Sequence, residues 1–251
     1  MQAIFIPTPT GPAECILPGE MECVLEGVKW GSAEETLTPA YWAMRYRLHD
    51  AYGDYRHFQL GRSLAEELAA CLLGGYGMPA EVGLAAFGRL RDEGLLEGCP
   101  SAEVIEERLS KPLLVNGRSV RYRFPRQKAA YLAAALKLIR IPVLPLSDRA
   151  LRNLLMEAPG VGPKTASWIV RNHRGSDEVA IIDIHLLRAG VAAGFFKPHW
   201  RPERHYFQLE SRFLEFAAAI GARASILDNL IWQHMRQLSA LMHPSQFSAA
   251  A

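Results

Sequence analysis

Residues 156–185 read MEAPGVGPKTASWIVRNHRGSDEVAIIDIH, and this stretch decides how the chain folds. Pro159 and Gly160 end a helix predicted over residues 148–157, capped by Ser147. Gly160 and Gly162 permit the positive φ and close backbone approach of a tight turn. Pro163 begins a second helix, predicted to reach residue 172, because its missing N–H costs nothing there. The sequence therefore predicts a helix-hairpin-helix over residues 148–172.

This turn predicts an anion site. The backbone N–H groups of Gly160, Val161 and Gly162, together with the N-terminus of the second helix, suit a DNA phosphate. Lys164 lies in the first turn of that helix, where the positive end of the dipole disfavours its ammonium form. A dry site would disfavour that form further and make the amine a nucleophile. Asp183 follows an apolar run and is placed to cap a helix over residues 184–194.

The arrangement resembles the helix-hairpin-helix DNA glycosylase superfamily, which includes endonuclease III and the 8-oxoguanine glycosylases. The resemblance rests on PGVGPKTA at residues 159–166 and IDIH at residues 182–185, and Ala158 departs from it where leucine is usual. It implies that Lys164 attacks the deoxyribose C1′ atom, with Asp183 assisting, and that the resulting Schiff base undergoes β-elimination. The alternative interpretation is a surface lysine at a helix start beside a capping aspartate.

Short matches favour the 8-oxoguanine branch of that superfamily. Cys15, Cys23, Cys71 and Cys99 fit no zinc or iron–sulfur spacing, unlike the four-cysteine cluster of endonuclease III, so we expect no metal and no other cofactor. Archaeal-type 8-oxoguanine glycosylases carry an aromatic residue four positions after the lysine and an Asp-x-x-x-Trp on a C-terminal helix. The matching residues here are Trp168, Asp228 and Trp232. The resemblance implies that they form the base pocket, whereas the alternative makes both tryptophans core residues and Asp228 a surface residue.

Charge is unevenly distributed along the chain. The net charge of the 251 residues is only +2, yet residues 108–147 contain nine Lys and Arg and no Asp or Glu. Arg121, Arg123 and Arg126 are therefore expected to contact the DNA backbone, with a solvated basic loop as the equal alternative. The expected partner is double-stranded DNA carrying a damaged or modified base, bound by a monomer. With no membrane segment or secretory signal, we expect a cytoplasmic protein, associated with the nucleoid in a prokaryote.

The expected fold is mainly α, a two-lobed helix-hairpin-helix glycosylase fold with a small N-terminal β element. Residues 1–35 are predicted to be a β-rich cover, and residues 36–251 the helical glycosylase domain. Within the latter, the helical barrel lobe spans about 63–195, and the second lobe combines 36–62 with 196–251. Asn116–Gly117 predicts a β-hairpin. Further helices are predicted at residues 63–73, 80–92, 101–109, 127–139, 206–220 and 224–242.

Three functions remain open. The chain is expected to be a bifunctional DNA glycosylase and AP lyase that excises 8-oxoguanine in base excision repair. The first alternative is the same chemistry on another modified base. The second is a non-catalytic DNA-binding module that uses the hairpin alone, and Lys164 together with Asp183 argues against it.

Overall fold

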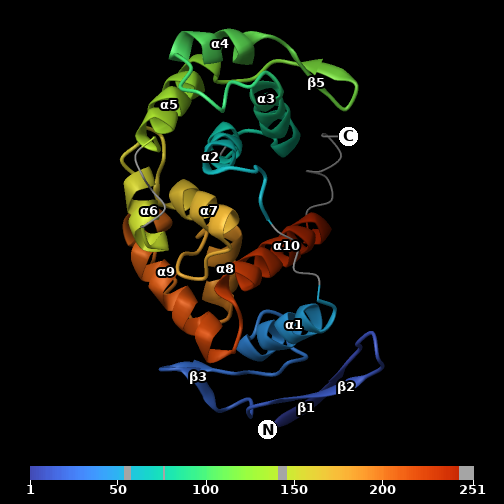
Figure 1. Cartoon of the computed structure of the whole chain (residues 1–251). Coiled ribbons are helices and arrows are strands. Elements are labelled where there is room, and N and C mark those ends of the chain that lie inside the picture. Colours follow the sequence, from blue (N-terminus) through green and yellow to red (C-terminus); the bar gives the residue numbers. More distant parts are fainter. Residues whose placement is uncertain (54–57, 76, 141–145, 243–251) are drawn as a thin grey trace. The chain divides into compact units, whose positions relative to one another are not determined.

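The structure, a computed structural model, describes residues 1–53, 58–75, 77–140 and 146–242. The chain divides into two compact units, one made of Met1–Arg56 and Asp177–Ala251 and the other of His57–Ser176 (Figure 1). They are called unit 1 and unit 2. The mainly helical fold is confirmed, and no helix within the described ranges is both long and apolar enough to cross a membrane.

Unit 1 begins with strands and continues with helices. Strands β1 (Gln2–Ile6) and β2 (Ala13–Leu17) pair antiparallel, with Ile4 opposite Cys15, and β3 (Cys23–Leu25) pairs with β4 (Val28–Lys29). Strand β2 lies beside helix α1 (Pro39–Ala51), as Figure 1 shows. The remaining helices are α8 (Ile184–Ala192), α9 (Pro202–Ala219) and α10 (Ala224–Met242).

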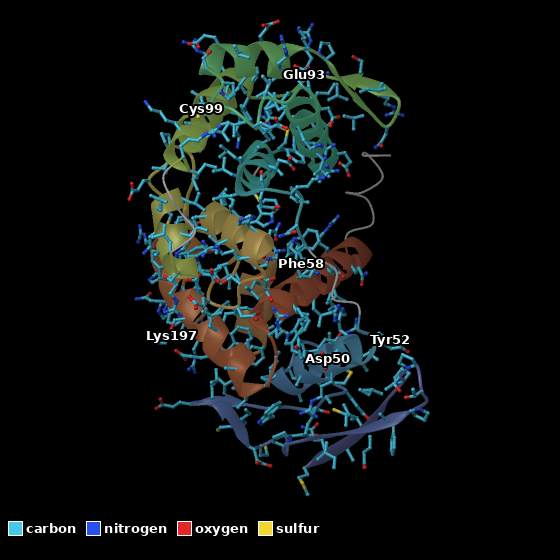
Figure 2. The ribbon with its side chains drawn as sticks, viewed as in Figure 1. Asp50, Tyr52, Phe58, Glu93, Cys99 and Lys197 are labelled. Carbon is cyan, nitrogen blue, oxygen red and sulfur yellow. The ribbon has the colours of Figure 1, made fainter. Side chains whose placement is uncertain are left out.

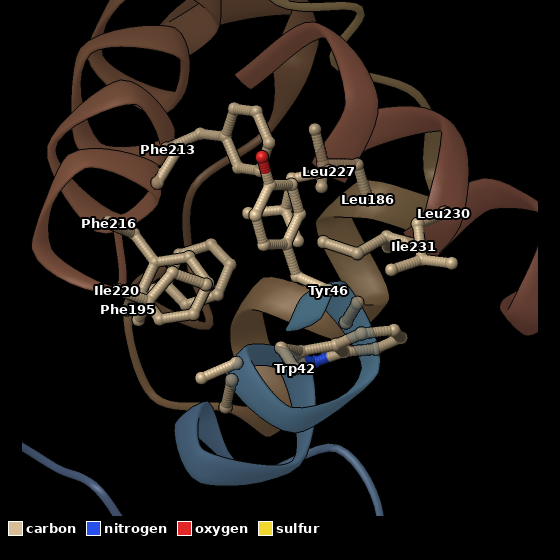
Figure 3. Packing of buried hydrophobic residues seen from close by; sticks show 14 of the residues in the cluster. Trp42, Tyr46, Leu186, Phe195, Phe213, Phe216, Ile220, Leu227, Leu230 and Ile231 are labelled. Carbon is tan, nitrogen blue, oxygen red and sulfur yellow. The ribbon is translucent and has the colours of Figure 1, made fainter. Parts of the chain in front are cut away.

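One hydrophobic core joins all parts of unit 1. Trp42, Phe213 and Phe216 are fully buried, and the rings of Phe195 and Phe216 stack with centroids 4.1 Å apart (Figure 3). Leu17 of the first hairpin belongs to the same core. The N-terminal strands, expected as a β-rich cover over residues 1–35, bury apolar side chains in the core that α1, α8, α9 and α10 share.

The two units divide the chain at a different place from the expected lobes. Residues 177–195, which we expected in the barrel lobe, belong to unit 1. Leu186 and Ala189 of α8 are buried in the core of this unit together with Phe195 and Phe196, which follow the helix. Periodicity identified α8, but it could not show which core its apolar face joins.

Unit 2 holds six helices and one hairpin among its described residues. The helices are α2 (Leu64–Leu73), α3 (Ala80–Asp92), α4 (Ala102–Ser110), α5 (Pro125–Leu138), α6 (Asp148–Leu155) and α7 (Pro163–Arg174). Strands β5 (Leu113–Val115) and β6 (Arg118–Val120) pair around Asn116 and Gly117, whose φ values are 48° and 75°. These positive φ values fit the tight hairpin turn predicted from the Asn-Gly pair.

Serine side chains start three helices of unit 2. The hydroxyls of Ser63, Ser101 and Ser147 accept hydrogen bonds from backbone N–H groups three residues later, at the starts of α2, α4 and α6. The core below these helices contains fully buried Leu68, Leu90, Leu109 and Leu132, among others. This frame holds the helix-hairpin-helix, α6 and α7.

Candidate active site

The turn between α6 and α7 is closed by its own backbone. Gly160 has a φ of 76°, in the left-handed region that favours glycine. The N–H of Val161 donates to the carbonyl of Ala158 at 3.1 Å. Val161 is also buried and its N–H closes the turn, so its expected contact with a phosphate stays a prediction. Gly160 and Gly162 are exposed and stay candidates for that role.

The N-terminus of α7 has no side-chain cap. Gly162 is the N-cap residue and Pro163 the first helical residue, so neither carries a hydroxyl or carboxylate that could accept from the first turn. The first N–H groups of a helix have no acceptor inside the helix, and they carry the positive end of its dipole. The end of α7 is therefore suited to an anion supplied from outside the chain.

The ring of Tyr131, in α5, packs against this turn at Gly160. A Cβ atom added to Gly160 would lie inside the ring of Tyr131 in α5, 2.8 Å from its Cγ atom. The Tyr131 hydroxyl is in turn 3.1 Å from the side-chain amide of Gln127. Gly160 is thus required both for its backbone conformation and for the space above the ring.

Lys164 and Trp168 occupy successive turns of α7. The Lys164 side chain is exposed, so unit 2 alone does not remove it from water. Trp168, four residues later on the same face, is half-buried, and its ring edge lies 4.0 Å from where a Cβ on Gly74 would be. Trp168 therefore packs against the C-terminal end of α2.

The C-terminal half of α7 is anchored by a buried carboxylate that sequence reasoning missed. Glu67 of α2 is fully buried, and its Oε1 accepts from the Asn172 amide at 2.7 Å. Its Oε2 accepts from the backbone N–H groups of Leu60 and Gly61 at 2.8 and 2.9 Å. The available signal was a second glutamate inside the apolar run LAEELAACLL. Such a carboxylate needs several donors to be tolerated in a core.

The neighbouring Arg171 is held by an aromatic ring. Its guanidinium carbon lies 4.7 Å from the ring centroid of Phe58, which Figure 2 labels. The thiol of Cys71 is 3.6 Å from Glu67, and burial together with that carboxylate raises its pKa well above the usual value. A protonated thiol at this position donates a hydrogen bond to Glu67.

Residues 108–147, called the basic segment, contain both exposed basic residues and basic or polar residues that bind the fold. Arg121, Arg123 and Arg126 are exposed, as a role in DNA binding requires. Lys128, by contrast, donates to the carbonyl of Leu72 at 2.6 Å, and burial lowers its pKa. The buried Tyr122 hydroxyl donates to the carbonyl of Leu73 at 2.6 Å. Lys128 and Tyr122 therefore cap the C-terminus of α2, where a cation and a donor are both favourable.

Asp183 caps α8, as predicted. Its Oδ1 accepts from the backbone N–H groups of His185 at 2.9 Å and Leu186 at 2.8 Å. Among the described residues of unit 1, its Oδ2 receives no hydrogen bond. The side chain is partly exposed, so one oxygen is committed to the fold and the other is available for chemistry.

Asp228 and Trp232 lie one turn apart on α10. Asp228 is 5% exposed, which excludes the surface alternative, and its Oδ2 accepts from the N–H of Ile181 at 3.4 Å. Trp232 is 37% exposed, so it is not a core residue. The guanidinium carbon of Arg236 lies 4.5 Å from its ring centroid and covers one face.

The predicted site residues come from both units. Lys164 and Trp168 share α7 in unit 2, whereas Asp183, Asp228 and Trp232 belong to unit 1. Within the described ranges, no three His, Cys, Asp or Glu side chains form a group that could hold a metal ion.

Comparisons with known proteins identify the family of this chain. The family model described as 8-oxoguanine DNA glycosylase matches residues 49–222. An 8-oxoguanine DNA glycosylase/AP lyase of Metallosphaera sedula is 35% identical, and the match covers 44% of this chain and 57% of that protein. An 8-oxoguanine DNA glycosylase/AP lyase of Korarchaeum cryptofilum is 33% identical, and the match covers 70% of this chain and 83% of that protein.

A solved structure shares the fold as well. The crystal structure of the Methanocaldococcus jannaschii 8-oxoguanine DNA glycosylase matches with a TM-score of 0.53 and 28% identity. The match covers 67% of this chain and 76% of that one. Since the family model also covers well over half of the sequence, this chain belongs to the 8-oxoguanine DNA glycosylase family.

Proposed function

We propose that this protein excises 8-oxoguanine from double-stranded DNA and then cleaves the strand, with Lys164 as the nucleophile. The observation that carries the proposal is the place of Lys164. Its exposed amine stands in the first turn of α7, directly after a glycine turn with no side-chain cap. A phosphate bound at that helix end would bring the amine to the backbone of the DNA.

The chemistry follows from an amine at the sugar. A neutral Lys164 amine forms a bond to C1′ while the bond from C1′ to the base breaks, and the base leaves with the bonding electrons and takes up a proton. The amine nitrogen then loses one proton, and the bond from C1′ to the ring oxygen breaks as that oxygen takes up a proton, which gives the protonated Schiff base. Removal of a C2′ proton then expels the 3′ phosphate by β-elimination, without any oxidant or reductant.

Asp183 is proposed to assist this step through its Oδ2 atom. A carboxylate can accept the proton that the lysine releases, or stabilise the positive charge that develops on the sugar. Either role needs a fixed oxygen, and the cap of α8 holds the Asp183 side chain in one orientation.

The base must leave the helix before it can be attacked. We propose that Trp168, Asp228 and Trp232 each contact the extruded base. A stacked base is worth about 1–3 kcal/mol per aromatic side chain. The partly exposed Trp232 and the half-buried Trp168 supply such surfaces. The Asp228 carboxylate only accepts hydrogen bonds, so it suits the N1–H and amino group of a guanine edge.

The other expectations about binding belong to the same proposal. Gly160, Gly162 and the exposed Arg121, Arg123 and Arg126 would bind the phosphates. The protein would act as a monomer in the cytoplasm, near the nucleoid of a prokaryote. Sedimentation with and without a duplex tests the monomeric state, because a monomer gives a complex of one chain per duplex.

Borohydride trapping tests the proposal. The reagent reduces the Schiff base and leaves the protein covalently bound to a duplex containing 8-oxoguanine. Lys164→Gln should abolish the trapped species and retain duplex binding, whereas Lys137→Gln, at another exposed position of unit 2, should trap normally. Trapping by Lys164→Gln at the normal rate would rule out this nucleophile. A panel of duplexes with other modified bases separates 8-oxoguanine from the alternative substrates, and a wild-type protein that traps none is a binding module.

A further inference from the structure

The segment before Asp183, residues 179–182, lies outside every sheet of the described chain. Val179, Ala180 and Ile182 are almost completely buried. Buried backbone N–H groups need acceptors, and a neighbouring strand would normally supply them. Side chains supply them here.

Three successive N–H groups of this segment each donate to a different side chain. Glu210 Oε1 accepts from Ala180 at 3.0 Å, Asp228 Oδ2 from Ile181 at 3.4 Å, and the Tyr206 hydroxyl from Ile182 at 3.3 Å. The Tyr206 hydroxyl also donates to the carbonyl of Ala180 at 2.8 Å. Tyr206 therefore binds the segment on both sides of Ile181.

The two residues of α9 are themselves held in place by burial. Tyr206 is 6% exposed and Glu210 is 5% exposed, and the two are four residues apart on one face of the helix. His205 has non-helical dihedrals (φ −125°, ψ 22°), so α9 is kinked directly before Tyr206. Tyr206 and Glu210, called the clamp from here on, therefore hold residues 180–182 by hydrogen bonds.

The clamp acts on the residue that follows. Asp183 has an extended backbone, with a φ of −110° and a ψ of −176°, and then begins α8. The α8 cap fixes the side-chain rotation of Asp183 through Oδ1. The clamp fixes the position of its backbone, because Ile182 is the residue directly before it. Together they determine where the free Oδ2 atom lies.

We propose that Tyr206 and Glu210 are positioning residues for the reaction, acting through Asp183. This inference rests on the proposed function, since it assigns Asp183 a part in the chemistry. Misplacement of a catalytic group by about 1 Å can lower a rate by about a hundredfold. We therefore expect removal of a clamp hydrogen bond to lower the rate of β-elimination by about ten- to a hundredfold.

The test measures single-turnover strand cleavage at an abasic site with saturating enzyme, at a temperature well below unfolding. An abasic substrate needs no base contacts, so the assay reports on Lys164 and Asp183 chemistry alone. Tyr206→Phe removes both hydroxyl hydrogen bonds and keeps the ring. Tyr46→Phe is the matched control, since its hydroxyl accepts from the backbone N–H of Arg223 at 3.2 Å elsewhere in unit 1.

Glu210 offers a second pair of variants. Glu210→Gln keeps an oxygen that can accept from Ala180, whereas Glu210→Leu removes the acceptor. The rate constant at saturation should fall for Tyr206→Phe and Glu210→Leu with little change in half-saturating DNA concentration. Glu210→Gln and Tyr46→Phe should cleave within about threefold of the wild type, since each keeps the clamp's acceptors in place. Thermal unfolding of each variant confirms that it is folded in the assay.

A double-variant cycle distinguishes positioning from general stabilisation. If Tyr206 acts through Asp183, then Tyr206→Phe has no further effect in an Asp183→Asn background. Equal rate losses in both backgrounds, or a wild-type rate for Tyr206→Phe, would overturn the clamp. A wild-type protein that cleaves no abasic site and forms no borohydride adduct would instead contradict the proposed function. The two failures are therefore separate results.

Discussion

Replacing Gly160 by alanine should damage the hairpin in two separable ways. The φ of 76° places an alanine in the left-handed region, at a cost of roughly 1–2 kcal/mol. The new Cβ would also lie inside the Tyr131 ring, 2.8 Å from its Cγ atom. Overpacking of this kind costs about 1–3 kcal/mol. We therefore expect Gly160→Ala to lower the free energy of unfolding by about 2–5 kcal/mol.

Gly94→Ala separates the two contributions. Gly94 has a φ of 70°, and no atom lies within 4 Å of where its Cβ would be. Alanine there should cost only the backbone contribution, roughly 1–2 kcal/mol. In the double variant Gly160→Ala with Tyr131→Ala the steric contribution disappears. The double variant should therefore lose less free energy of unfolding than the sum of the losses of the two single variants.

Urea denaturation of the wild type and these variants measures the differences, and binding to an undamaged duplex measures the effect on DNA affinity. The expected order of stability is wild type, Gly94→Ala, then Gly160→Ala. Binding should weaken for Gly160→Ala but not for Gly94→Ala, because only the turn at Gly160 presents N–H groups beside α7. Equal losses of stability for Gly94→Ala and Gly160→Ala would refute the role assigned to the Tyr131 ring.

Three further features can each be tested by substitution: the proposed base contact of Asp228, the exposed arginines between residues 121 and 126, and Asp177, whose carboxylate accepts from the backbone N–H of Ser225 at the start of α10 at 2.8 Å. Asp228→Asn should slow the excision of 8-oxoguanine on the order of tenfold more than it slows cleavage of an abasic site, because it weakens one charged hydrogen bond to the base. Equal losses on the two substrates would mean that Asp228 only holds the backbone of Ile181. Replacing Arg121, Arg123 and Arg126 by glutamine should make the slope of log affinity against log salt shallower by about 0.9 for each phosphate that is no longer neutralised, and an unchanged slope would remove them from the interface. Asp177→Asn keeps an oxygen that can accept from Ser225 but removes the negative charge, so it should cost about 0.3–1 kcal/mol at pH 7 in thermal unfolding, the value of a charge at a helix N-terminus. This difference should vanish as the pH falls below the ordinary aspartate value of 3.8 and through the lower folded value.

The sign of the Asp177 prediction comes from its partners. Burial raises the pKa of this carboxyl, but two hydrogen bonds from Ser225 and one from Arg223 lower it by more in total. A folded pKa below the unfolded value gives stability that is present above pH 3.8 and is lost on acidification. A stability difference that persisted to about pH 2 would contradict a charged cap at α10.

Local signals predicted the local structure. The Ser147 cap, Pro163 as the first residue of α7 and the Asn116–Gly117 turn were all confirmed, as were the bounds of α3. Each depends on residues that are close in sequence and whose backbone preferences are strong. The fold class and the family could be predicted for the same reason, because the hairpin motif is itself local.

Long-range partners could not be predicted. Nothing near Glu67 in sequence indicates that it receives Asn172, and nothing near residues 179–182 indicates that side chains of α9 and α10 replace a neighbouring strand. A short helical turn, residues 202–204, precedes the helix predicted to begin at residue 206, and the two meet at a kink at non-helical His205. These outcomes are decided by tertiary contacts, which periodicity along one segment does not contain.

If the Asp183 carboxylate also serves the proposed reaction, its double use has an evolutionary consequence. Functional residues commonly reduce stability, so their replacement tends to stabilise a protein, and an unused active site decays readily. Asp183 is the opposite case, because the same side chain starts α8 through its Oδ1 atom. Most substitutions there would cost the cap, about 1 kcal/mol, in addition to the activity. Under the proposed function, drift away from aspartate would be opposed by folding as well as by selection for repair, and asparagine is the substitution whose side chain would still cap the helix.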